Sequence, residues 1–137
     1  MNTYYFDNTQ FMNSSSYSEF ISKNSEKGIL KIRAYSANQA VPVKGLRVIV
    51  SYIINNDKII FFDGYTNDSG IIERIVLPVP KLDINNMDVP NTITYDIEAT
   101  YEPDNINTIY KVNMYENICV VQNINIVPKL NREEEVL

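Results

Sequence analysis

The chain has 137 residues, enough for a single domain with a hydrophobic core. A net charge of −5 argues against a nucleic-acid backbone or an anionic membrane as the main partner. The chain has one cysteine and no histidine, which excludes an internal disulfide and the usual forms of zinc hydrolysis, serine triads and Cys–His nucleophiles.

The composition predicts an all-β protein with many turns. Ten Tyr and nineteen Ile favour strands, whereas eighteen Asn favour turns. No apolar run approaches the ~20 residues that a membrane-spanning helix needs, so we expect no membrane insertion. The first residues show neither a basic start nor an apolar signal core, so we expect synthesis in the cytoplasm without a signal peptide. The final location stays open between spore, cell envelope and phage particle.

Residues 1–27 are predicted to form an N-terminal arm that carries one short helix at about 17–24. Ser16 precedes Glu19 by three residues, which is the spacing of a capping box at a helix start. The rest of the arm is rich in Asn, Ser and aromatic residues without a sustained period, and we expect it to be mobile.

Residues 28–128 are predicted to form one β-sandwich domain, because runs of alternating apolar and polar residues are separated by turn-forming residues. The clearest alternation puts Ile93, Tyr95 and Ile97 on an inner face. Seven strands are expected, at 28–36, 46–54, 58–66, 71–77, 93–101, around 110–114 and at 118–126. They predict a seven-stranded antiparallel, Ig-like β-sandwich of two sheets with a short N-terminal helix, followed by a charged tail at 129–137.

Two motifs in this domain resemble a known class of small sandwich. They are Ala40-Val41-Pro42-Val43-Lys44-Gly45 and Thr66-Asn67-Asp68-Ser69-Gly70, with Tyr95 and Ile97 matching a later strand. The pattern resembles the prealbumin-like (transthyretin-like) sandwiches, which include carboxypeptidase regulatory-like and Cna-B-type domains, although Leu46 stands where alanine is usual. The runs at 77–80 and 122–128 are similar to modules of clostridial spore and cell-wall proteins. The resemblance covers about residues 17–130 and implies a fold more strongly than a function.

Some Cna-B-type domains carry an internal isopeptide bond between a lysine and an Asn or Asp. The matching lysine here is Lys31, and the last strand offers Asn123 and Asn125. Alternation places all three on outer faces, and the acidic segment associated with the bond is missing, so we expect no isopeptide bond.

The carboxylates are predicted to serve turns and solvated strand faces. Asp57 and Asp68 lie in turns at opposite ends of strands, so these two and Asp63 are not expected to converge on a calcium ion. Asp96 and Glu98 share a strand face, as paired catalytic carboxylates can, but nothing indicates a cleft there. We expect no catalytic residue, no metal site and no cofactor, and a carboxylate-only glycosidase is the enzymatic alternative.

The last strand contains two unusual residues. Gln122 interrupts its inner face between Val120 and Ile124, and we expect the buried amide to bond to backbone or to the N-terminal segment. Cys119 falls on the opposite face, where we expect a small, half-buried thiol.

One end of the sandwich is a candidate binding site. If strand directions alternate, the 37–45, 67–70 and 102–107 connections share this end with the tail. The end combines aromatic and hydrogen-bonding groups, which suits a sugar or a peptide strand, and its candidate residues are Tyr65, Asn67, Asp68, Tyr101, Glu102 and Asp104. The alternative is that Tyr65 and Tyr101 close the core.

A second candidate is an interface around Ile59-Ile60-Phe61-Phe62, a strand that is apolar on both faces. Apolar residues on other outer faces extend it, so that the candidate interface comprises Ile49, Ile60, Phe62 and Val121. Either the N-terminal segment, with Phe6, Phe11 and Phe20, covers the face of this strand that would be open to water or a partner does, and self-coverage is favoured.

These observations predict a non-enzymatic structural or binding module of a bacterial spore, cell-envelope or extracellular assembly. Its partner is expected to be a protein or a cell-wall glycan, and self-association is left open. The alternative is a phage-tail or virion structural subunit that assembles through its arm and apolar sheet face.

Overall fold

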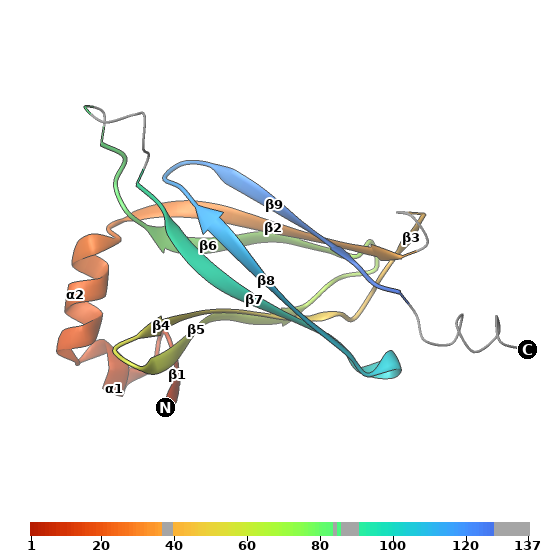
Figure 1. Ribbon diagram of the computed structural model, residues 1–137, viewed down its shortest axis with the longest axis horizontal. Helices are drawn as coiled ribbons and strands as arrows, with labels where there is room; N and C mark the ends of the chain where they lie inside the picture. Colours follow the sequence, from red (N-terminus) through yellow and green to blue (C-terminus); the bar gives the residue numbers. More distant parts are fainter. Residues whose placement is uncertain (37–39, 84, 86–90, 128–137) are drawn as a thin grey trace, which may run out of the picture.

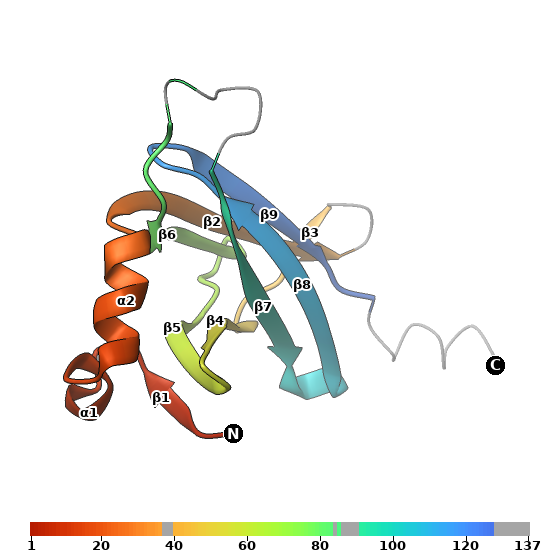
Figure 2. The same cartoon turned by 60° about the vertical axis from the view of Figure 1, so that its left-hand side comes forward.

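The computed structural model describes residues 1–36, 40–83, 85 and 91–127, which form two packed β-sheets with two helices at one end (Figures 1 and 2). This mostly β architecture agrees with the all-β sandwich predicted from the sequence. The predicted charged tail lies outside the described residues, as do parts of the 37–45 connection and of the segment between the strands predicted at 71–77 and 93–101. Neither described helix is long and apolar enough to cross a membrane.

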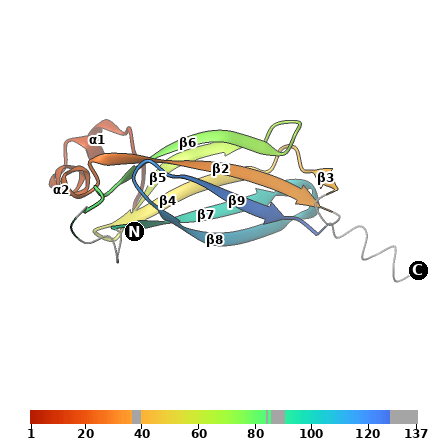
Figure 3. The same ribbon diagram turned by 90° about the horizontal axis from the view of Figure 1, so that it is seen from above.

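The larger sheet has five strands, in the order β1 (Thr3–Tyr5), β5 (Asp57–Tyr65), β4 (Arg47–Ile54), β7 (Ile93–Tyr101) and β8 (Ile106–Met114). The smaller sheet is centred on β2 (Glu26–Ser36). One edge of β2 pairs with β6 (Ile71–Val79) and the short β3 (Val41–Pro42), and the other edge pairs with β9 (Cys119–Asn125). Figure 3 shows both sheets extending along the same long axis.

The predicted count of seven antiparallel strands is not met. The described residues contain nine strands, and two pairs are parallel: β1 with β5, and β2 with β9. The physical reason is that direction alternates along the chain from β2 to β9, leaving aside the short β3, so the first and last of these strands run the same way. Because β2 and β9 are neighbours, they pair in parallel.

Inward-facing residues of both sheets form the core, as the alternating pattern predicts. Leu30 and Ile32 of β2 face Val48 and Val50 of β4, and all four side chains are fully buried. Tyr95 is also buried, and its hydroxyl donates to the carbonyl oxygen of Pro78 at 2.5 Å. Burial raises the pKa of Tyr95 above its ordinary value, so this phenol stays a donor.

The N-terminal segment is folded against the sandwich rather than extended from it. After β1 come α1 (Thr9–Met12), capped by the side chain of Asn8, and α2 (Ser15–Lys23). The expected helix at 17–24 corresponds to α2, but its N-cap is Ser14 rather than Ser16. Ser14 Oγ accepts from Tyr17 N at 3.2 Å, which lets the helix start earlier than the capping-box spacing indicated.

Phe61 is the point at which the N-terminal segment meets the sandwich. The ring of Phe6 stacks on Phe61 with a centroid separation of 4.6 Å, and the ring of Phe20 lies 5.5 Å from Phe61 and 5.6 Å from Tyr52. Figure 1 shows α2 crossing the end of the sandwich from one sheet to the other. The rings of the segment therefore pack on the core side of this strand, at Phe61, and the expected cover over its outer face is met only by β1, where Tyr5 lies beside Ile60.

A β-bulge in β5 explains why this strand looked apolar on both faces. Val50 pairs with Phe62 and Ser51 pairs with Ile60, which leaves Phe61 as an extra residue. A bulge shifts the alternation by one position beyond it. Phe62 therefore faces the core side together with Phe61, and only Ile60 faces outward. The grouping of Ile60 and Phe62 on one face is wrong for this reason.

Candidate functional site

Thr66 holds together the end of the sandwich where the 40–46 segment meets the β5–β6 turn. Its buried hydroxyl accepts from Leu46 N at 3.0 Å and donates to the carbonyl oxygen of Val43 at 2.7 Å. Gly70 has a φ of 74°, and a Cβ there would lie 2.3 Å from the carbonyl oxygen of Ala34. Thr66 and Gly70, two residues of the sequence motif at this end, therefore stabilise the fold.

The two tyrosines of the predicted binding end do not come together. Tyr65 pairs across the sheet with Arg47, next to the inward-facing Val48, so its side chain lies on the outer face. Tyr101 follows the inward-facing series of β7, is half-buried and packs against the core. The alternative role in closing the core therefore fits Tyr101 and not Tyr65.

The remaining residues of that end serve turns. Asn67 Oδ1 accepts from Ser69 N and from Ile71 N, which fixes the β5–β6 turn. Asp68 lies 2.9 Å from the ammonium of Lys44, an exposed pair whose hydrogen bond raises the pKa of the lysine. The other two, Glu102 and Asp104, lie in the 3-10 turn η2 between β7 and β8.

The outer face of the larger sheet carries several exposed apolar side chains. We call it the outer face and define its apolar members by their cross-strand pairing: Tyr5, Ile49, Ile53, Ile60, Tyr65 and Ile109. Four of them are half-exposed or more, namely Ile53 (50%), Tyr5 (51%), Tyr65 (60%) and Ile109 (66%). The hydroxyl of Tyr5 donates to Asp63 at 3.3 Å, and Tyr5 pairs across the strands with Ile60, which is buried.

Charged residues on the outer face form ion pairs between strands. The three pairs, each 2.7 Å apart, are Arg47–Asp63, Lys58–Glu98 and Lys111–Asp96. The two-pronged hydrogen bond from Arg47 lowers the pKa of Asp63 below its ordinary value. Each of these three acids thus has a basic partner on the outer face.

Only part of the predicted interface lies on the outer face. Ile49 and Ile60 belong to it. Phe62 faces the core side because of the bulge in β5, and Val121 projects from β9 in the other sheet. Alternation alone could place residues on inner or outer faces, but it could not tell which sheet an outer face belongs to.

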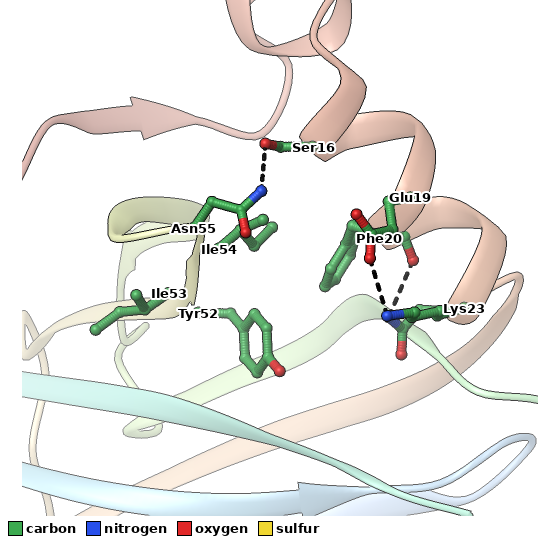
Figure 4. Close-up of a pocket in the computed structure, with 9 residues that line it drawn as sticks. Ser16, Glu19, Phe20, Lys23, Tyr52, Ile53, Ile54 and Asn55 are labelled. Atoms are coloured by element: carbon green, nitrogen blue, oxygen red, sulfur yellow. Dashed lines mark hydrogen bonds and ion pairs between the residues drawn. The ribbon is translucent and has the colours of Figure 1, made fainter.

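The sequence did not reveal a pocket of about 200 Å³ between α2 and the β4–β5 turn (Figure 4). We call it the helix pocket. The rings of Phe20 and Tyr52 form its apolar wall, and its other lining residues are Ser16, Glu19, Lys23, Asn24, Ile53, Ile54 and Asn55. It exists because Asn55 and Asn56 both adopt positive φ, giving a tight turn that lets Asn55 Nδ2 donate to Ser16 Oγ at 2.7 Å.

The polar groups of the helix pocket already bind one another. Glu19 and Lys23 form an ion pair of 3.0 Å, and the amide of Asn24 donates to the carbonyl oxygen of Phe20. A small ligand could stack on the aromatic wall, but it would have to compete with these internal pairs. The Asn55-Asn56 pair indicates the turn that forms one side of the helix pocket. The position of the helix on the other side could not be predicted from the sequence.

The described residues hold no cluster of three or more Asp, Glu, Cys or His side chains suited to a metal ion. Asp57 accepts from Asn2 N, whereas Asp63 and Asp68 pair with Arg47 and Lys44, so the three aspartates stand apart.

The outer side of the smaller sheet carries the three residues between which we expect no isopeptide bond. Lys31 forms a 3.4 Å ion pair with Glu73, and Asn123 and Asn125 are exposed on β9. Cys119 is exposed and not half-buried, because β9 is an edge strand whose odd-numbered residues face outward.

Comparison with models of known protein families finds no match for this chain, and a search of curated proteins finds no significant match.

Proposed function

We propose that this protein is a non-enzymatic structural module that binds a protein partner through its outer face, within a bacterial spore, cell-envelope or extracellular assembly. The observation that carries the proposal is the exposure of four large apolar side chains on one sheet face, among charged residues already committed to internal pairs. Exposed apolar patches with a polar frame are typical of protein contact surfaces.

Tyrosine supports this reading of the outer face. Tyr5, which lies beside Ile60 in the middle of β5, and Tyr65, at the end of β5, are each half-exposed or more, and tyrosine is enriched at protein interfaces. The helix pocket is the weaker candidate, because its polar groups are engaged with one another. The placement in a spore or envelope assembly rests on the similarity of the runs at 77–80 and 122–128 to modules of clostridial spore and cell-wall proteins.

A phage-tail or virion subunit that assembles through its N-terminal arm is the less favoured class. Such an arm would be expected to reach a neighbouring subunit. Here Phe6 stacks on Phe61 of the same chain, and β1 pairs with β5, so the arm is used internally.

Affinity capture from the cells that produce the protein tests this proposal. The wild type is compared with Ile109→Lys, which adds a charge to the outer face, and with Val76→Lys, which adds the same charge to the outside of the smaller sheet. We expect a defined protein partner that binds the wild type and Val76→Lys but not Ile109→Lys. Equal capture by all three, or capture only on cell-wall glycan, contradicts the proposal.

A further inference from the structure

One side of β9 carries backbone groups that do not bond to β2. Within the described part of the chain, β9 pairs only with β2. The carbonyl oxygen of Ile118 accepts from Ile29 N, and Ile126 N donates to the carbonyl oxygen of Tyr35. Because bonding direction alternates along a strand, the even-numbered residues of β9 bond to β2. The N–H and C=O groups of the odd-numbered residues therefore point to the open edge: Cys119, Val121, Asn123 and Asn125.

The other sheet edges carry features that discourage strand pairing. β3 contains Pro42 and β6 contains Pro78, and proline has no N–H to donate. β1 has three residues, and β8 has Lys111 near its centre. In contrast, β9 has seven residues with no proline and no charge. An edge of this kind is a template for another strand.

We propose that β9 pairs antiparallel with β9 of a second copy of this chain, about a two-fold axis at Gln122. Residues that form hydrogen-bonded pairs across the two copies must both be odd-numbered, whereas even-numbered residues face each other in non-hydrogen-bonded pairs. The symmetric register that uses all seven residues then places Cys119 opposite Asn125 of the second copy, Val121 opposite Asn123, and Gln122 opposite Gln122.

This register explains why a glutamine occupies position 122. The residue interrupts an apolar row between Val120 and Ile124, and in one copy its amide donates to the neighbouring carbonyl oxygen of Asn123 at 3.0 Å. A primary amide offers both donors and acceptors. Two Gln122 side chains that meet on the axis can bond to each other and release the Asn123 carbonyl for the second strand.

Charge does not oppose the pairing. The nearest basic residues, Lys31 and Arg33, lie on β2 beside Val121 and Asn123. Three strand spacings separate β2 from β2 of the second copy, about 14 Å. This exceeds the Debye length of about 8 Å at physiological ionic strength. The inference goes beyond the proposed function and does not rest on it, because β9 and the outer face belong to different sheets.

Sedimentation velocity of the full chain tests the dimer. Val121 and Val76 are matched residues: both lie on the outside of the smaller sheet, 46% and 43% exposed, at opposite edges. We expect the wild type and Val76→Lys to dimerise, and Val121→Lys to raise the dimer dissociation constant at least about tenfold. Val121→Pro should act like Val121→Lys, because it removes an N–H that is not bonded to β2. A wild type that stays monomeric at its highest soluble concentration overturns the proposal, as does equal dimerisation of Val121→Lys and Val76→Lys in folded protein.

Cross-linking tests the register. Facing Cα atoms in such a pair are about 5.5 Å apart, within reach of a disulfide. Asn125→Cys should therefore join to Cys119 of the second copy under oxidised glutathione and give a covalent dimer on a non-reducing gel. The two cysteines of one chain cannot join, since six residues of one strand separate them by about 20 Å. Asn123→Cys is the control, and cross-linking as efficient as that of Asn125→Cys overturns the axis at Gln122.

Discussion

Replacing Thr66 with valine tests whether one buried hydroxyl holds the loop end of the sandwich together. The hydroxyl joins Leu46 N and the carbonyl oxygen of Val43, at 3.0 and 2.7 Å, in a residue that is 4% exposed. Valine keeps the shape but leaves both backbone groups without this partner. Since each buried unsatisfied group costs about 1–3 kcal/mol, we expect the free energy of unfolding to fall by about 2–4 kcal/mol.

The matched control is Thr66→Ser, which keeps the hydroxyl and loses one methyl group. This loss should cost about 1 kcal/mol. Urea denaturation of the wild type and both variants gives the three unfolding free energies. If valine destabilises the protein no more than serine does, the hydroxyl does not carry this end of the fold and the reasoning is wrong.

Four further predictions concern the N-terminal segment, pH and chemistry. Phe6→Ala should undock the N-terminal segment, lower stability by about 2–3 kcal/mol and open the first residues to limited proteolysis; an unchanged cleavage pattern would show that the stacking is incidental. Asp63→Asn should lower the free energy of unfolding at neutral pH, by an amount that shrinks as the pH falls below about 4. Arg47 lowers the pKa of Asp63 in the folded state below 3.8, so the ion pair stops stabilising the fold once the pH falls through this lowered pKa. A difference in unfolding free energy that stays constant with pH would contradict this. Intact-mass measurement should give the unmodified chain, whereas loss of one ammonia would reveal an isopeptide bond at Lys31. Incubation with peptidoglycan should release no product, and a turnover that Glu98→Gln abolishes would make the protein an enzyme.

Much of the fold could be predicted because a strand that is buried on one face alternates between apolar and polar residues. The alternation of Leu30 and Ile32, or of Tyr95 and Ile97, corresponds to buried residues of β2 and β7. The same period occurs in parallel and antiparallel pairs, so it could not show that β2 and β9 run the same way.

The candidate surfaces were harder to predict, because they depend on register and on which strands are neighbours. One extra residue, Phe61, turns Phe62 toward the core side and separates it from Ile60. Tyr65 and Tyr101 lie at the same end of the sandwich but on opposite faces of one sheet, a difference that emerges only from pairing with β4. The N-terminal strand and helices were missed in part because their stability comes from contacts with Phe61 and not from local pattern.

Hydroxyl-radical footprinting tests the central claim, that the outer face is the contact surface of this module, most directly. The isolated protein is compared with the same protein in its native assembly, and side-chain oxidation is measured by mass spectrometry. Tyr5, Tyr65 and Ile109 should be oxidised in the isolated protein and protected in the assembly, while the buried Tyr95 should resist oxidation in both. Equal oxidation of the three exposed residues in both samples would contradict the claim.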